Sequence, residues 1–475
     1  MLSAHSPSFD ASLWPLQYVL LVSSMGIIFG CDLGTLFINQ DYLSNLYLIS
    51  INRSHVVLGT YVLGFIFGTF ISGYVTYGSG RKLSLVSSGL IGTFAILASI
   101  VAPNFAIFLC AEFVIGFSFG LYIVAACLYN NEISHPRWRS LSLVLLPDGI
   151  ILGGLLSLIT YTEPANKPFI VFITLVIFNL ILMAFTIMKL PESPRFLAVT
   201  GSTDAALSVL FKLRHDMGIA ARELAEINEC CRGENRGLEF YMQTAIYRRL
   251  LGLLCISIFI LDLSGIFIIP YALLDNLSLS IFCPEENYCY FTLNSAMIYT
   301  AFTLIFISFI LHTIALERFS RRFIILISLS TTGIFLALAT ITTLFAESDL
   351  KNYALTIFFL GFIFFGLGGH TSLLCVLVPE ILPIRGREFG LAVIFLTHGI
   401  GLLFSLQTYM PAIHQLGFSA FLAIMTLLLG FTLYLLYQFL PFTSNGKSLE
   451  SIELRILSLA KLSALRNFEP AKDRL

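Results

Sequence analysis

The feature that most constrains this chain is a series of long apolar runs. About 20 apolar residues in an α-helix span the hydrocarbon layer of a bilayer. A helix also satisfies its own backbone hydrogen bonds, as the lipid interior requires. We therefore expect twelve transmembrane helices in an all-α polytopic fold, at 14–38, 55–77, 83–102, 104–130, 140–161, 167–189, 249–279, 292–316, 322–346, 353–378, 387–410 and 416–440.

The composition excludes several other classes of protein. Of the 475 residues, 57% are hydrophobic and 12% are charged, and the net charge is −1. A soluble protein carries about 25% charged residues, so this chain is neither soluble nor disordered, and it is not a nucleic-acid binder. It contains no H-E-x-x-H, G-x-S-x-G or P-loop motif and no Cys/His set with metal-ligand spacing. We expect no enzyme activity, no cofactor and no metal.

Basic residues predict the orientation in the membrane. All of the 27 Lys and Arg residues except Arg53, Lys167 and Lys351 lie in connectors and a tail on one side of the predicted helices. Cytoplasmic loops carry an excess of Lys and Arg. We expect a multi-pass protein of the plasma membrane, monomeric, with both termini in the cytoplasm.

Two features of the opposite side agree with this orientation. The Asn-x-Ser/Thr sequons, at Asn52 and Asn276, both fall outside, which predicts glycosylation, although chance occurrence explains a sequon equally well. Cys283 and Cys289 share one outer loop and are close enough in sequence to form a disulfide in an oxidising compartment.

The chain repeats itself in two halves. Its long polar connector, 190–248, separates six predicted spans from six. Span 4 ends with Glu132 and Arg139, and span 10 ends with Glu380 and Arg387 at the same separation. Such matching patterns indicate duplication. We expect a bundle at 1–189, a linker with short amphipathic helices at 190–248, a second bundle at 249–440 and a cytoplasmic tail at 441–475.

Short motifs in both halves resemble the sugar-porter branch of the major facilitator superfamily over almost the whole chain. They are FGCDLG at 29–34, GRK at 80–82, YNNEI at 129–133, PESPRFL at 191–197, ERFSRR at 317–322, PEILP at 379–383 and GKSLE at 446–450. The resemblance implies twelve helices in two bundles related by a pseudo-twofold axis. It also implies transport by alternating access at a site between the bundles.

By analogy with that family, charged residues at the cytoplasmic helix ends are expected to pair and to clamp the bundles together in the outward-open state. A simpler interpretation, that they only mark topology, explains the Arg but not the Glu residues at matching places. Tyr77 and Gly78 replace an acidic and a basic residue of the family motif, which predicts a looser clamp. The expected gating residues are Arg81, Glu132, Arg139, Glu192, Arg195, Glu317, Arg321, Arg322, Glu380 and Arg387.

Acidic residues inside the predicted spans point to the transport site, because each costs roughly 2.5–3.5 kcal/mol to place mid-membrane. Asp32 matches the aspartate that proton-coupled members use, and Glu112 stands where those members have an arginine. These carboxylates should face each other and titrate together, which suits proton carriage but also binding of a cationic solute or Na⁺. A lone membrane histidine, such as His370, is more often a packing contact.

The positions that contact hexose in the family lack its amides and its tryptophan. We still expect the solute to bind among these positions and the buried acids, which are Asp32, Glu112, Pro147, Asp148, Leu261, Asp262, Phe267, Tyr271, Cys375 and His398. The family default is a small polar sugar, with protons as a further partner. Two alternatives stay open: a non-sugar, cationic metabolite, and a sensor that kept the scaffold without transporting.

Overall fold

The structure, a computed structural model, describes residues 15–38, 54–162, 168–231, 235–267, 295–345, 349–441 and 448–458. Every regular element in these ranges is a helix. Eight of the described helices are long and apolar enough to cross a membrane. The predicted all-helical, multi-pass fold is confirmed.

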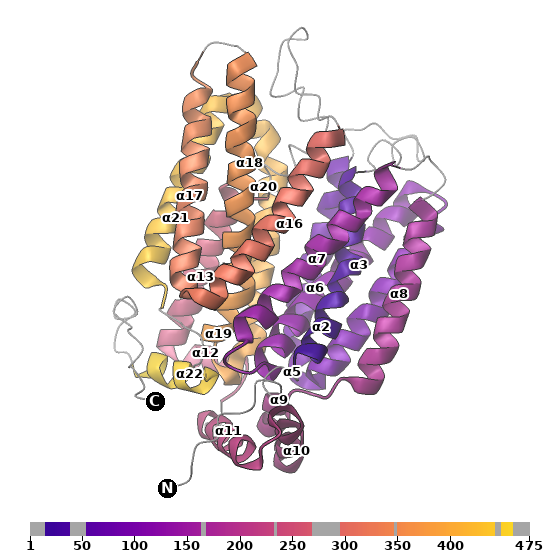
Figure 1. The fold of residues 1–475 in the computed structure, drawn as a ribbon, viewed down its shortest axis with the longest axis vertical. Coiled ribbons are helices and arrows are strands. Elements are labelled where there is room, and N and C mark those ends of the chain that lie inside the picture. Colours follow the sequence, from indigo (N-terminus) through magenta and orange to yellow (C-terminus); the bar gives the residue numbers. More distant parts are fainter. Residues whose placement is uncertain are drawn as a thin grey trace.

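The first half of the chain forms one group of helices, the N-terminal bundle (Figure 1). Its members are α2 (Leu16–Ser24), α3 (Gly26–Ile38), α5 (Ser54–Ile100), α6 (Phe105–Ile133), α7 (Arg139–Thr162) and α8 (Pro168–Lys189). α5 holds two of the predicted spans, because the backbone turns at Gly80, where φ is 86° and ψ is 176°.

The second half forms the C-terminal bundle, beside the first (Figure 1). It consists of α13 (Ala245–Leu263), α16 (Ser295–Arg318), α17 (Arg321–Thr342), α18 (Asp349–Thr371), η2 (Ser372–Leu377), α19 (Val378–Ile381), η3 (Ile384–Gly386), α20 (Arg387–Leu416) and α21 (Phe418–Phe439). α13 ends well before residue 279, the end predicted for span 7. η2 is a π-helical segment within the predicted span 10, and such segments often occur at functional sites.

Short helices gather at one end of both bundles, which we call the linker end (Figure 1). They are α9 (Pro194–Val199), α10 (Thr203–Arg214), α11 (Met217–Cys230), α12 (Leu238–Gln243) and α22 (Leu449–Leu457). The apolar faces of α9, α10 and α11 pack on one another around Ala206, Leu210 and Ile227. This end therefore carries a small helical cap of its own.

Glycines allow helices of the N-terminal bundle to pack backbone against backbone. A Cβ atom on Gly30 of α3 would collide with the Ile150 carbonyl of α7, and one on Gly153 of α7 would collide with the Ile27 carbonyl of α3. In lipid, helices associate through such close packing rather than through the hydrophobic effect. The α3–α7 contact therefore holds the backbone around Asp32 in a fixed position.

Gly80 gives a direct test of the turn within α5. We expect Gly80→Ala to lower the thermal unfolding midpoint, because a left-handed backbone costs a residue with a Cβ roughly 1–2 kcal/mol. The new Cβ would also lie 2.5 Å from a Glu192 carboxylate oxygen. Scanning fluorimetry in detergent measures the midpoint. Gly78→Ala is the matched control, since a Cβ at Gly78 meets nothing within 4 Å. Equal midpoints for the two variants would contradict this account.

Candidate functional site

Arg81 joins the two bundles at the linker end. Its guanidinium makes two hydrogen bonds to the Glu132 carboxylate, of 2.9 and 2.8 Å, within the N-terminal bundle. The same group lies 2.5 Å from a carboxylate oxygen of Glu388 on α20 in the C-terminal bundle. Arg81 is 2% exposed and Glu132 is 1% exposed. One buried cation is thus shared between two carboxylates from opposite bundles.

Arg195 ties the cap to this network. It pairs with Glu450 of α22 at 2.9 Å and with Glu223 of α11 at 3.5 Å. Its Nη1 also donates to the main-chain carbonyl of Glu132. Glu223 makes a second ion pair with Arg214, with Nε–Oε2 at 2.8 Å. Ion pairs therefore join α9, α10, α11 and α22, and a hydrogen bond from Arg195 holds this cap to the end of α6.

The C-terminal bundle has its own copy of the pair, between Arg321 and Glu380 at 3.1 Å. Two hydrogen bonds with main-chain groups then cross between the bundles. The Asn131 side-chain amide donates to the Pro379 carbonyl at 2.7 Å, and the Leu141 N–H donates to the Glu317 carboxylate at 3.0 Å. These contacts close the linker end in this structure.

Other predicted gating residues have different partners. Glu192 accepts main-chain N–H groups of Arg81, Lys82 and Ser193, so it caps the helix that restarts after Gly80. Burial raises its pKa despite those donors. Arg387 donates to the Leu382 carbonyl at 3.1 and 2.9 Å.

Two further predicted gating residues differ in whether they interact across the bundles. Arg139 of α7 is buried and interacts electrostatically with Glu380 of the other bundle. Arg322 is bonded to the Tyr437 carbonyl at 2.7 Å, within its own bundle.

Sequence reasoning missed Glu388, Glu223 and Glu450 as ion-pair partners. Glu388 adjoins Arg387 and Glu450 lies in the GKSLE segment, so proximity to a known motif was the available signal. Nothing in the sequence marks Glu223.

Tyr77 stands where the family motif is acidic, and it makes aromatic contacts instead of an ion pair. Its ring lies 5.5 Å from that of Phe389 on α20, and the Arg236 guanidinium lies 5.3 Å from the Tyr77 ring. At Tyr77 an aromatic contact with the other bundle thus takes the place of an ion pair. That the clamp is looser than in the family stays a prediction.

Asp32 and Glu112 interact electrostatically inside the N-terminal bundle. Both are buried, on α3 and α6, and both also interact with Tyr61 of α5. Asp32 Oδ2 and Glu112 Oε2 have no hydrogen-bond partner among the described residues, and neither acid forms an ion pair there. Two buried carboxylates that interact in this way are stable only if one binds a proton or if a cation joins them.

Asp262 lies in a second acidic centre, in the C-terminal bundle. Its Oδ1 is 3.0 Å from His370 Nε2 and 3.0 Å from His398 Nδ1. His370, for which the sequence favours a packing contact between helices, pairs with this buried acid of a neighbouring helix.

The remaining predicted solute positions are spread along the inner helices. Pro147 and Leu261 are buried apolar side chains. Asp148 of α7 accepts a hydrogen bond from Thr313 of α16 at 3.3 Å, so it links the bundles. The Phe267 ring lies 4.9 Å from that of His370.

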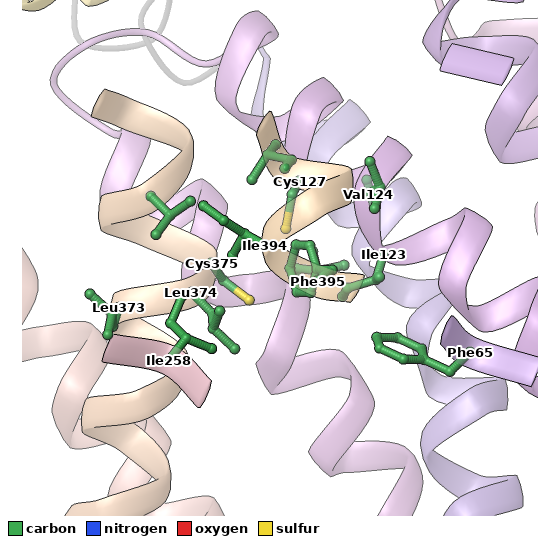
Figure 2. Packing of buried hydrophobic residues seen from close by; sticks show 14 of the residues in the cluster. Phe65, Ile123, Val124, Cys127, Ile258, Leu373, Leu374, Cys375, Ile394 and Phe395 are labelled. Atoms are coloured by element: carbon green, nitrogen blue, oxygen red, sulfur yellow. The ribbon is translucent and has the colours of Figure 1, made fainter. Parts of the chain in front are cut away.

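Cys375 contacts Cys127 of the opposite bundle. Figure 2 shows both thiols among buried side chains that include Ile123, Ile258 and Phe395. At the position where the family has a tryptophan, this chain thus has a small side chain, Cys375, that packs across the bundle interface.

Several predicted sites lie outside the described residues: Asn52, Tyr271, Asn276, Cys283 and Cys289. Their roles in solute binding, glycosylation and disulfide formation stay predictions.

Comparisons with known proteins agree on one family. The family described as "Sugar (and other) transporter" matches residues 21–455. The galactose-proton symporter of Escherichia coli (strain K12) is 24% identical over 454 residues, covering 93% of this chain and 94% of the symporter.

Solved structures show the same fold. The proton:xylose symporter XylE bound to 6-bromo-6-deoxy-D-glucose matches with a TM-score of 0.75 at 16% identity, covering 94% of this chain and 99% of XylE. The inward-open XylE of E. coli matches with a TM-score of 0.63 at 18% identity, covering 93% and 99%.

Removal of the inter-bundle charge pair should open the linker end. In Glu388→Gln, Arg81 loses a charged partner, and a hydrogen bond to a charged group contributes about 1.5–3 kcal/mol. We expect N-ethylmaleimide to label Cys127 and Cys375 roughly tenfold faster or more, as read by peptide mass spectrometry. Glu239→Gln, the same change at an exposed position of α12, should leave the rate unchanged. Unaltered labelling in Glu388→Gln would show that this pair does not hold the bundles closed.

Acid should weaken the cap. Burial would raise the pKa of Glu223, but Arg214 and Arg195 outweigh it and lower the pKa from 4.5 to about 2. A lowered folded-state pKa stabilises the fold above the ordinary value and loses that contribution as pH falls from about 4.5 towards 2. The protection of α10 and α11 amides, relative to the intrinsic exchange rate at each pH, should fall over this range, and less so in Glu223→Gln. Glu229→Gln should keep the wild-type profile; if Glu223→Gln keeps it too, the ion pair does not stabilise the cap.

Proposed function

This chain belongs to the Sugar (and other) transporter family of multi-pass membrane proteins, and on that premise we propose that it carries a sugar together with protons by alternating access. The observation that carries the proton-coupled part is the electrostatic interaction between the buried Asp32 and Glu112 side chains. The match over nearly the full length of this chain and of the galactose-proton symporter supports transport. It does not favour the alternatives of a cationic metabolite or a sensor.

The two carboxylates give the proton a place to bind. Since neither forms an ion pair in the described part of the chain, at most one ionises easily while both stay buried. A proton taken up by this pair would neutralise it, and release would follow when the bundles rock and water reaches the site. Coupling arises because solute binding and proton binding both depend on the same bundle arrangement.

The linker end gates access in this mechanism. Its buried ion pairs hold the bundles together on one side, so the solute enters from the other. Breaking the pair between Arg81 and Glu388 would leave buried charges uncompensated, unless water enters as the end opens. The basic residues on this side indicate that it faces the cytoplasm. The conformation described here is then closed to the cytoplasm.

The proposal includes the organisation predicted from sequence. The bundles occupy 1–189 and 249–440, joined by the linker 190–248 and followed by the tail 441–475. The proposed working unit is a monomer. The plasma membrane is the proposed location.

Transport into proteoliposomes tests this function. An inside-alkaline pH gradient should drive accumulation of D-galactose or D-xylose above the equilibrium level. Asp32→Asn and Glu112→Gln should each abolish accumulation, because the pair can no longer cycle a proton, while sugar exchange without a gradient persists.

Glu229→Gln, on the exposed face of α11, is the matched control and should accumulate sugar like the wild type. Accumulation that survives both Asp32→Asn and Glu112→Gln would remove these residues from proton coupling. No flux of any sugar in a panel of hexoses, pentoses and polyols would overturn the proposed substrate class.

A further inference from the structure

Three titratable side chains from three helices converge in the C-terminal bundle. Asp262 Oδ1 on α13 is hydrogen-bonded to His370 Nε2 on α18, at 3.0 Å. His398 Nδ1 on α20 lies 3.0 Å from each of the two Asp262 carboxylate oxygens. Asp262 and His370 are 0% exposed, and His398 is 8% exposed. The two imidazole rings lie 5.1 Å apart, and both face the same carboxylate.

The carboxylate of Asp262 has no permanently charged side chain to neutralise it among the described residues. Its ion-pair partners there are the two histidines, and no Lys or Arg is among them. The groups acting on His370 are likewise Asp262 and His398. An isolated carboxylate is strongly disfavoured in an apolar interior. One proton on an imidazole would make the cluster neutral.

The free nitrogen of His370 argues for a proton rather than a metal ion. The three ligand atoms lie within 4.8 Å of one another, close enough to surround a metal. A metal-bound histidine, however, almost always donates its other N–H to a carboxylate or carbonyl. His370 Nδ1 is buried and has no partner in the described part of the chain. A divalent ion would also leave the cluster with a net positive charge.

The same nitrogen decides which histidine takes the proton. A charged His370 would carry a buried N–H at Nδ1 without an acceptor, which is unfavourable. His398 is the histidine of the cluster with exposed surface. With Nδ1–H donated to Asp262, the lone pair of Nε2 can accept a proton from a hydronium ion. The Nε2–H bond forms as an O–H bond of hydronium breaks and water leaves, and the reverse step returns the proton to water.

His398 also lies where the bundles meet. Its ring makes an edge contact with Phe65 of α5, with centroids 6.2 Å apart. The neighbouring Gly399 packs on Ile66 and Phe65, and a Cβ there would lie 2.7 Å from Ile66. Rocking of α20 against α5 would therefore change the access of water to the His398 ring. Asp262 itself is fixed from α20, since Ser405 donates to its main-chain carbonyl at 3.0 Å.

The position of Asp262 repeats that of Asp32. Each lies on the first membrane helix of its bundle and is followed by a similar sequence, Asp-Leu-Gly at 32–34 and Asp-Leu-Ser-Gly at 262–265. Each also meets a titratable side chain from the fourth predicted span of its own half, Glu112 on α6 or His370 on α18. The duplication thus gave both bundles a buried acid with a titratable partner.

We propose that Asp262 and His398 form a second proton-binding site, in the C-terminal bundle, and that His370 is a positioning residue that holds the Asp262 carboxylate. The link to transport rests on the proposed function, whereas proton binding by the cluster stands on its own geometry. The transporter then binds protons at two separate places, one in each bundle.

Nitrogen NMR of the full chain in lipid nanodiscs, with ¹⁵N-labelled histidine, tests the site directly. The chain has 8 histidines, and His398→Gln assigns the signal of His398. We expect His398 to be protonated in the wild type, because its ring faces the Asp262 carboxylate, and neutral in Asp262→Asn. Glu112→Gln should leave it charged. His312→Gln is the matched control, because His312 is a buried histidine bonded to Ser328 in the same bundle.

The role of His370 is tested by His370→Gln in the same spectra. His398 should still bind a proton, but its nitrogen shifts at a fixed pH should differ from those of the wild type, since one hydrogen bond to Asp262 changes. Shifts equal to those of the wild type would show that His370 does not position the carboxylate.

Two results would overturn the proposal. One is a neutral His398 from pH 5 to pH 7 in the wild type, or an imidazolium that persists in Asp262→Asn. The other is binding of Zn²⁺ at micromolar concentration that shifts the signals of both His370 and His398, which would make the cluster a metal site.

Sugar flux separates this proposal from the proposed function. Absent flux with a charged, Asp262-dependent His398 defeats only the proposed function, and the reverse pattern defeats only this site.

Discussion

The guanidinium of Arg81 is the contact on which the closed linker end depends. It is buried between Glu132 of its own bundle and Glu388 of the other, so one cation neutralises acids on both sides of the interface. Stacking of Arg81 on the Phe196 ring, at 5.1 Å, brings the start of the linker to the same point. Because a buried charge without a partner is strongly unfavourable, the two bundles must either stay together here or separate with water between them. That all-or-none choice is what alternating access needs.

The interior of each bundle differs from the linker end, because its acids have no Lys or Arg partner among the described residues. Asp32 faces Glu112 in one bundle, and Asp262 faces two histidines in the other. In both places the described surroundings leave a proton as the simplest neutralising ion. In our proposals the linker end uses fixed cations to hold a conformation, whereas the interior uses titratable groups that gain and lose charge as the conformation changes.

Much of the fold followed from apolar runs and from motif spacing, because the bilayer admits few backbone structures and sets their length. The paired Glu and Arg at matching helix ends also gave the position of the clamp. The partners within the clamp did not follow: Glu388, Glu223 and Glu450 come from segments far apart in sequence, and Glu192 binds backbone N–H groups instead of an arginine side chain. Long-range pairing of charges depends on helix packing, which a single sequence does not encode locally.

The sequence by itself determined that the chain crosses a membrane many times, that it is duplicated, and that acids lie within its spans, because these properties depend on residue type and order along one chain. Only the tertiary structure decided which of those acids meet which partners. His370 illustrates the difference: on its own helix it is one polar residue in an apolar run, and its role arises only because α13, α18 and α20 place three side chains around one buried carboxylate.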